Sequence, residues 1–140
     1  MAAILEGSSH SAFLEKLELI AGFLREISPA PVVFRPFHEL THDWAWWGSG
    51  VTSADEFVRL WRLTVTTLRQ EHALRNILFA WSVASNALDS ELESRYPGDD
   101  VVDVVGVDVY GSIGQLSADL RAVGAFAALH RKPFALTEVG

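Results

Sequence analysis

Apolar side chains recur every three or four positions in three stretches of the chain, which is the spacing of one face of an amphipathic helix. The first stretch covers residues 11–27, and Ser28-Pro29 ends it because a residue before proline disfavours the helical conformation. The second opens at a capping box that runs from Ser53 to Glu56. The apolar positions of the three predicted helices are Phe13, Leu14, Leu17, Ile20, Leu24 and Ile27, then Phe57, Leu60, Trp61, Val65 and Leu68, and finally Leu120, Val123, Phe126 and Ala127.

Four short runs of consecutive apolar residues alternate with these helices. They cover residues 32–34, 77–81, 101–109 and 133–137, and a polar loop over residues 85–100, with one helical turn near 88–94, separates the second run from the third. Continuous rather than alternating apolar runs are typical of parallel strands that are covered by helices. The order of elements therefore predicts a single α/β domain over residues 1–140, built from about four parallel strands.

Polar residues with catalytic potential follow each predicted strand. His38-Glu39 comes after the first strand, Trp81-Ser82 ends the second, Asp108 and Tyr110 end the third, and Glu138 ends the fourth. Right-handed crossovers bring the carboxyl ends of parallel strands to one rim, where α/β proteins place their chemistry. Two glutamates on such a rim, among aromatic residues, indicate a catalytic site.

Composition narrows the possible functions. The chain carries a formal net charge of −7, and its 11 basic residues are not clustered, which argues against a nucleic-acid partner or an anionic membrane surface. The absence of cysteine excludes disulfides, thiolate metal sites and a cysteine nucleophile. No apolar run approaches the length of a transmembrane helix, and the first ten residues do not resemble a signal peptide.

The segment His38-Glu39-Leu40-Thr41-His42 matches the H-E-x-x-H pattern of zinc metalloproteases. That chemistry requires both histidines on one face of a helix, with the glutamate beside them as base. Pro36 just before the segment and two glycines after Trp47 disfavour a helix here. The zinc protease is therefore the weaker of the interpretations, and we expect no metal and no cofactor.

The same glutamate suits an enzyme that acts on sugars. Glycosidases use two carboxyl groups across a cleft, one as acid/base and the other as nucleophile or as base for water. Three tryptophans, Trp44, Trp46 and Trp47, follow Glu39 closely and could serve as platforms for the apolar faces of sugar rings.

Four motifs of this chain resemble glycoside hydrolase family 26, whose members are mostly endo-β-mannanases. They are Arg35-Pro36-Phe37-His38-Glu39 followed by Trp44 and Trp46-Trp47-Gly48, and then, in the family's order, residues 96–100, 102–110 and 132–140. The resemblance covers essentially the whole chain. It implies part of a (β/α)₈ TIM barrel, a retaining double displacement, and a β-mannan or related neutral polysaccharide as substrate.

The resemblance also implies roles for individual residues. Glu39 would be the acid/base at the end of strand four of the barrel, and Glu138 the nucleophile at the end of strand seven. His38 would support the acid and the substrate, Trp44 would form a sugar subsite, and Tyr110 would orient the nucleophile. The further expected substrate-binding residues are Arg35, Trp47 and Trp81.

The chain departs from the family pattern in two ways. Thr41-His42 stands where the family usually has other residues after the glutamate, and the length is well below the about 250 residues of a typical barrel. We therefore expect a partial domain with strands four to seven, weakly active or inactive alone, and able to self-associate through exposed sheet edges. A non-catalytic carbohydrate-binding remnant is the alternative. The size of the substrate implies a secreted or cell-surface full-length parent.

Overall fold

The computed structural model describes residues 1–87 and 89–140. The helices and strands follow one another along the chain in nearly strict alternation. In chain order they are α1 (Ala2–Leu5), α2 (His10–Glu26), β1 (Val32–Phe34), α3 (Ala54–Thr66), the π-helical turn η1 (Thr67–Glu71), β2 (Ile77–Ala84), α4 (Asp89–Arg95), β3 (Val104–Val109), α5 (Ile113–Leu129) and β4 (Phe134–Val139).

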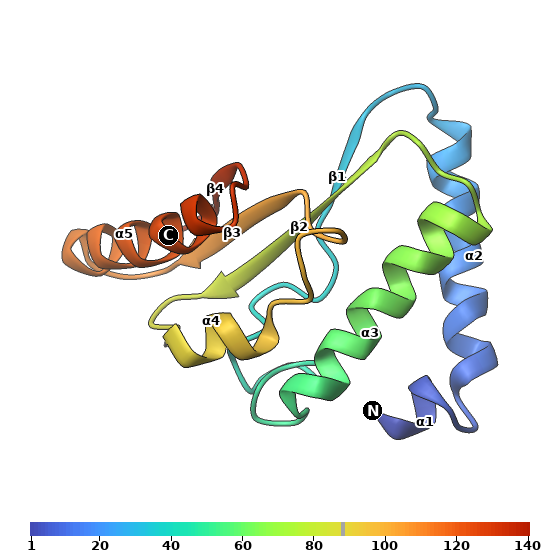
Figure 1. Ribbon diagram of the computed structural model, residues 1–140, viewed down its shortest axis with the longest axis horizontal. Helices are drawn as coiled ribbons and strands as arrows, with labels where there is room; N and C mark the ends of the chain where they lie inside the picture. The colour runs from blue at the N-terminus through green and yellow to red at the C-terminus, as the bar shows by residue number, and fades with distance from the viewer. Residues whose placement is uncertain (88) are drawn as a thin grey trace.

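The four strands form one parallel sheet in the order β1-β2-β3-β4. Each strand pairs with the next in sequence, and α5 lies alongside β3 and β4 while α2 and α3 lie together at the other end of the molecule (Figure 1). The predicted α/β class is confirmed. Because all strands run in the same direction, their carboxyl ends meet along one rim, which is where the candidate residues lie.

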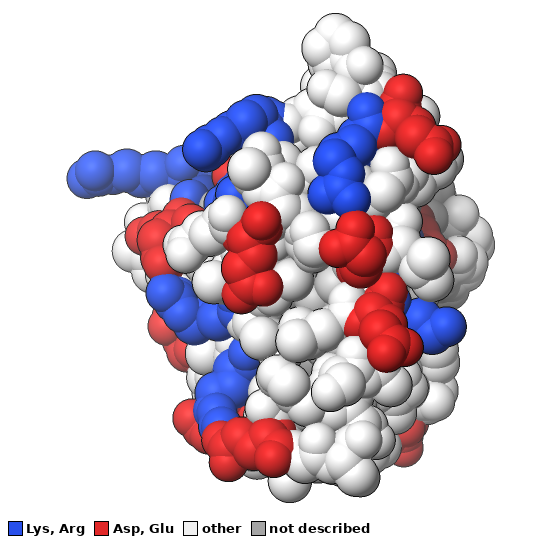
Figure 2. Space-filling view, turned by 90° about the vertical axis from the view of Figure 1, so that its right-hand side faces the viewer, with Lys and Arg blue, Asp and Glu red and all other residues white. Residues whose placement is uncertain are grey.

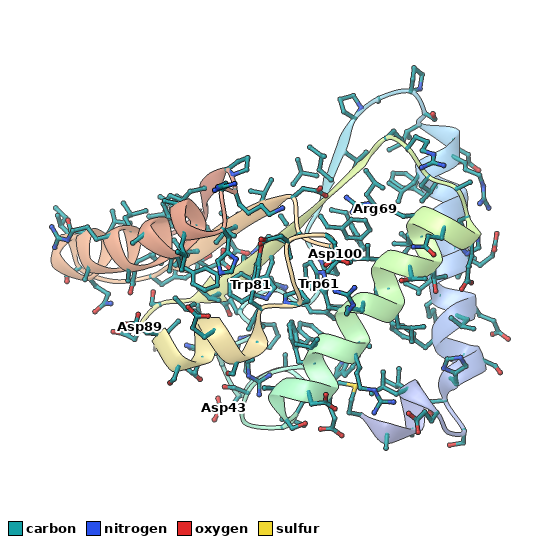
Figure 3. The ribbon with its side chains drawn as sticks, in the orientation of Figure 1. Asp43, Trp61, Arg69, Trp81, Asp89 and Asp100 are labelled. Carbon is teal, nitrogen blue, oxygen red and sulfur yellow. The ribbon has the colours of Figure 1, made fainter. Side chains whose placement is uncertain are left out.

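The core fills the space between the sheet and the helices. Trp61 of α3 is fully buried, and its indole N–H donates to the carbonyl of Val101 at 3.0 Å. Phe57 from the same helix and Phe79 from β2 are also inaccessible to solvent and pack against the Trp61 ring. Trp61 and Trp81 both lie in this interior (Figure 3). By contrast, Val33 and Leu78 on the opposite face of the sheet are exposed.

Several boundaries of the helices and strands differ from the predictions, one of them because a side chain replaces a backbone hydrogen-bond partner. The third strand begins at Val104 rather than at residue 101, because the Asp103 carboxylate accepts the N–H of Phe79 at 2.6 Å in place of a ladder carbonyl. The second strand continues to Ala84, beyond the predicted end. The helical turn predicted near residues 88–94 corresponds to α4, with Leu88 itself outside the described residues. The short helix α1 was not predicted.

The surface carries both signs of charge. On the face shown in Figure 2, acidic and basic side chains are interspersed over uncharged surface, and basic side chains project beside one another at the upper left. Several of the charges are paired, such as Arg62 with Asp100 at 2.6 Å. Within residues 1–87 and 89–140, the helices are all too short or too polar to cross a bilayer.

Candidate active site

The rim of the sheet is organised around Arg35, which directly follows β1. Its guanidinium donates to the carboxylate of Asp108 in β3 at 2.7 Å and to the hydroxyl of Ser82 in β2 at 3.1 Å. It also forms an ion pair with Glu138 of β4. Planar guanidinium groups suit such carboxylate contacts because they offer several N–H donors in a fixed arrangement. One side chain thus contacts residues from the three other strands.

A bulge in β4 aims two neighbouring side chains at this cluster. The register passes from Val107 opposite Leu136 to Asp108 opposite Glu138, so Thr137 is the extra residue on its strand. In a regular strand, adjacent side chains point to opposite faces, whereas a bulge redirects them. The Thr137 hydroxyl accordingly lies 2.5 Å from the Asp108 carboxylate, while the adjacent Glu138 reaches Arg35.

Glu138 is held as an anion by two donors. The ion-paired Arg35 guanidinium, followed by the Tyr110 hydroxyl that donates at 2.8 Å, keeps the pKa of Glu138 below its usual value. The same hydrogen bond raises the pKa of Tyr110, so this phenol stays protonated and remains a donor. A carboxylate that is ionised and fixed from two sides has the properties that a nucleophile requires.

Asp108 is the most deeply buried acid of the cluster. Its side chain has no solvent exposure, and burial raises the pKa of Asp108, an effect that the Thr137 hydroxyl and Arg35 offset in part. Burial alone would lower the pKa of Arg35, but the carboxylates of Glu138 and Asp108 raise it overall. A buried carboxylate needs such a partner, because an unpaired charge away from water is costly.

Glu39 lies in the loop after β1 and faces an indole. The Trp44 N–H donates to the Glu39 carboxylate at 2.7 Å, and the ring of His38 lies 5.3 Å from the Trp44 ring, centroid to centroid. Glu39 has φ of 51° and Phe37 has φ of 54°, conformations that cost non-glycine residues about 1–3 kcal/mol and that cluster at functional sites. The loop is therefore bent to present Glu39 at the rim.

The aromatic residues after Glu39 divide into exposed and anchoring side chains. Trp44 and Trp46 are 55% and 44% exposed, so both offer ring faces to solvent. Trp47 is half-buried, donates its N–H to the carbonyl of His38 at 2.8 Å and packs edge-on against Phe37. Trp47 thus fixes the backbone beside Glu39 rather than presenting a broad surface.

A buried arginine of α4 anchors the far end of this loop. The Arg95 guanidinium donates to the carbonyls of Thr52 and Ser49 and lies over the Phe57 ring. Burial lowers the pKa of Arg95, so the loop carbonyls compensate for the loss of hydration. The segment between Glu39 and α3 is held at both ends.

The structure brings most of the predicted site residues together on one rim. Glu138, Tyr110 and Arg35 are in direct contact, and the charge of His38 contributes to lowering the pKa of Glu138. On the other side of this group, the charge of Glu39 contributes to raising the pKa of Tyr110. The loop after β1 and the end of β4 are therefore within electrostatic reach of each other.

Trp81 is placed elsewhere. It is fully buried on the helix side of β2, where its ring packs against Tyr96 and against Phe126 of α5. The predicted position at a strand end is wrong because β2 continues for three more residues, to Ala84. Trp81 is therefore a core residue in this structure and not part of the rim.

The zinc interpretation fails on backbone geometry. Residues 36–42 form turns and bends rather than a helix, and Glu39 adopts a left-handed φ. His38 and His42 consequently do not share a helical face, which the H-E-x-x-H site requires. Within the described part of the chain, no group of three or more potential ligands is arranged to hold a metal ion.

One supporting residue of the site, Thr137, was not predicted; Ser82 and Asp108 were predicted at strand ends, but their contacts with Arg35 were not. The signal for Asp108 is present in the sequence, because a lone acid within the apolar strand Val104–Val109 must find a cationic partner once buried. No comparable pattern marks Thr137, whose position depends on the bulge.

Comparisons with known proteins place this chain in a family. The sequence profile described as glycosyl hydrolase family 26 matches residues 3–140. A mannan endo-1,4-beta-mannosidase of Bifidobacterium adolescentis is 33% identical over 155 residues, which cover 98% of this chain and 16% of that protein. A mannan endo-1,4-beta-mannosidase of Bacillus subtilis is 32% identical, covering 97% of this chain and 37% of the relative.

Solved structures show the same relationship. A family 26 beta-mannanase from Bacteroides ovatus superposes with a TM-score of 0.90 at 38% identity, covering 99% of this chain and 43% of that one. A modular endo-beta-1,4-mannanase from Cellulomonas fimi superposes with a TM-score of 0.87 at 36% identity, and the match covers 96% of this chain and 33% of that one. The chain spans less than half the length of these relatives, and its four parallel strands form a half-barrel that matches part of their TIM barrel. This chain belongs to glycosyl hydrolase family 26.

Proposed function

We propose that this chain carries the catalytic residues of an endo-β-1,4-mannanase that works by a retaining double displacement. One observation carries the proposal: Arg35 and Tyr110 hold Glu138 as an anion on the rim where Trp44 holds Glu39. Two carboxyl groups in distinct environments, beside exposed indoles, provide the acid/base and nucleophile that glycoside hydrolysis needs.

In this mechanism Glu138 attacks the anomeric carbon while Glu39 protonates the leaving glycosidic oxygen. The attack forms a covalent glycosyl-enzyme, which water then hydrolyses with Glu39 acting as base. Arg35 keeps the Glu138 carboxylate ionised and oriented, and the Tyr110 hydroxyl fixes its second oxygen. Such fixed donors favour the reaction because little reorganisation is needed when charge moves.

The substrate side of the proposal is a neutral β-linked polysaccharide. Relatives of this chain are named mannan endo-1,4-beta-mannosidases, and uncharged mannan is compatible with a chain of net charge −7. The exposed Trp44 and Trp46 supply ring faces for sugar units, with His38 beside them. Because such a polymer is too large to enter a cell, we also propose that the full-length parent acts outside it.

Release of reducing ends from galactomannan tests the proposal. We expect turnover by a longer protein that contains this segment, and we expect Glu138→Gln to abolish it. Glu71→Gln is the control and should change turnover little, because Glu71 is an exposed glutamate on η1. We expect the 140-residue chain alone to be weakly active or inactive; robust turnover that Glu138→Gln abolishes would show instead that the half-barrel suffices. Proton NMR of the first product anomer would refute a retaining mechanism if the configuration were inverted.

The open shape of the half-barrel favours a second candidate function, carbohydrate binding without hydrolysis. The exposed Trp44 and Trp46 persist in the isolated chain, whereas substrate contacts from other strands of a complete barrel do not. Calorimetry with mannohexaose discriminates between the two functions. Binding that requires Trp44 and is accompanied by no cleavage, in either the chain or its longer parent, would favour this candidate over the enzyme.

A further inference from the structure

The turn that begins at Glu39 is anchored at both of its central residues. The N–H of His42 donates to the carbonyl of Glu39 at 2.9 Å and closes the turn. The first central residue, Leu40, is fully buried in the core. The second is Thr41, whose hydroxyl accepts the N–H of Ala84, the last residue of β2, at 3.1 Å. The turn therefore cannot shift without losing core packing or a hydrogen bond to the sheet.

The Thr41 hydroxyl stands in the place of a strand carbonyl. The short strand β1 ends at Phe34, which pairs with Phe79, whereas β2 continues to Ala84. Ala84 is buried, and a buried N–H without an acceptor costs free energy. A hydroxyl can accept such an N–H as a carbonyl does. Thr41 therefore supplies the acceptor that β1, having ended, does not supply to this part of β2.

This contact connects the two glutamates of the rim through the sheet. Ala84 lies opposite Asp108 in the register of β2 and β3, and Asp108 lies opposite Glu138 in the register of β3 and β4. Thr41 is thus bound to the row of strand partners that carries Glu138. Because Thr41 comes two positions after Glu39, the position of the Glu39 backbone relative to Glu138 depends on this hydrogen bond.

Glu39 requires such anchoring because its backbone is strained. Its φ of 51° lies in the left-handed region, which a non-glycine residue keeps only where the surrounding structure imposes it. The Thr41 hydroxyl is bound to β2, and the Thr41 carbonyl accepts the Ser49 hydroxyl at 2.8 Å, so the peptide is held from two sides. The Glu39 carboxylate in turn accepts the Trp44 N–H at 2.7 Å. Backbone and carboxylate are thus fixed by separate contacts.

We propose that Thr41 is a positioning residue for Glu39, and that its hydrogen bond to β2 sets the distance between the two carboxyl groups of the rim. The inference rests on the proposed function, in which Glu39 is the acid/base and Glu138 the nucleophile. A retaining glycosidase requires carboxyl groups about 5–5.5 Å apart, so a displaced turn lowers the rate of the chemical step. Thr41 is one of the two unspecified positions of the H-E-x-x-H pattern, and the zinc interpretation gives it no role.

Kinetics of a longer protein that contains this segment test the effect on catalysis. Thr41→Val keeps the β-branched shape and removes the hydroxyl, so we expect kcat on mannan to fall about 10- to 100-fold with little change in KM. Thr41→Ser restores the acceptor and should recover most of the rate. Thr64→Val is the matched control, because Thr64 is a buried threonine of α3 whose hydroxyl donates to the carbonyl of Leu60 at 3.0 Å. It should leave kcat unchanged.

NMR of the indole protons in the 140-residue chain tests the positioning without an activity assay. The Trp44 N–H donates to the Glu39 carboxylate, so its proton should resonate downfield of a free indole, and Trp44→Phe assigns the signal. We expect Thr41→Val to move this resonance toward the free value and Thr64→Val to leave it in place. Thr41→Ser lacks the methyl group that fixes the hydroxyl rotamer and should cause a smaller shift in the same direction, which keeps the test valid if Thr41→Val fails to fold. Circular dichroism verifies folding.

Three results would overturn the proposal. They are a Trp44 resonance that the Thr41 variants leave in place, a loss of turnover that Thr41→Val and Thr64→Val share equally, and a rise in KM with unchanged kcat. Absence of turnover in the unmodified longer protein would instead refute the proposed function. The Trp44 resonance would then decide by itself whether Thr41 positions Glu39.

Discussion

Arg35 directly follows one edge strand of the sheet, β1, and Glu138 lies on the other, β4; the two residues are 103 positions apart in the chain, and their side chains form an ion pair at the rim. The same guanidinium bonds Asp108 and Ser82 from the two central strands. This one residue therefore joins the carboxyl ends of all four strands and also keeps Glu138 ionised. The stability of the sheet and the ionised state of Glu138 therefore depend on the same contacts.

Replacing Arg35 by methionine removes the cationic partner of two carboxylates. Asp108 is fully buried and would be left unpaired, so we expect Arg35→Met to lower the free energy of unfolding by about 2–3 kcal/mol; fully buried pairs lose more, but Arg35 is partly exposed. Urea denaturation measures the change. Arg25→Met is the control, because Arg25 and Glu18 are both exposed and their pair contributes about 0–1 kcal/mol. Equal losses in the two variants would contradict the structural role of Arg35.

The fold was largely predictable because the burial of each helix and strand requires apolar residues at regular positions in the local sequence. A strand that is buried at most of its positions, such as β2, must be apolar at successive positions, and an amphipathic helix such as α3 shows its three-to-four spacing and its capping box. What failed were boundaries that depend on a distant partner. Asp103 displaces the start of β3 because it bonds Phe79, and no local pattern shows that contact.

Only those residues of the site could be predicted whose side-chain type alone indicates a catalytic or sugar-binding role. Two glutamates after apolar strands and the tryptophans near Glu39 indicated a sugar-acting rim. The bulge at Thr137 was not predictable, because it arises from the register between β3 and β4 and not from the composition of either. For the same reason Trp81 was misplaced: its sequence position does not reveal how far β2 extends.

Removing the Tyr110 hydroxyl should shift the titration of Glu138. The pKa of Glu138 is lowered by Arg35 and by Tyr110, so Tyr110→Phe leaves one donor and should raise that pKa while keeping it below the ordinary value. Because the pKa of Glu138 is lowered in the folded state, its ionised form stabilises the fold at pH values above the ordinary glutamate pKa. This stabilisation is lost as the pH falls through the folded-state pKa. Tyr110→Phe raises that pKa, so the variant should lose the stabilisation at a higher pH. Carbon-13 NMR of labelled glutamate measures the shift, and an unchanged titration would contradict the hydrogen bond.

Replacing Trp44 by phenylalanine keeps an aromatic ring but deletes the N–H that donates to Glu39. If Glu39 is the acid/base, losing a hydrogen bond to a charged group at about 1.5–3 kcal/mol should lower kcat/KM on mannan roughly 10- to 150-fold. The assay requires an active form, which we expect to be a longer protein that contains this segment. Trp46→Phe is the control, since Trp46 is also exposed and its ring packs edge-on against Phe37 and Trp47. Similar losses in both variants would assign Trp44 a platform role only.

Gly106 provides a steric test of the bulge, because a methyl group at this position would collide with Thr137. A Cβ built on Gly106 lies 2.8 Å from Cγ2 of Thr137 and 3.1 Å from Cβ of Ser82, and the hydrogen-bonded, β-branched Thr137 has little freedom to move. We expect Gly106→Ala to destabilise the protein by about 1–3 kcal/mol and to displace Glu138 from Arg35. Gly22→Ala in α2, where nothing lies within 4 Å, should instead stabilise by about 0.4–1 kcal/mol. Denaturation curves for both variants measure the change in stability, and the Glu138 pKa followed by NMR reports on the site itself. A Gly106→Ala variant with unchanged stability would show that the bulge is free to rearrange.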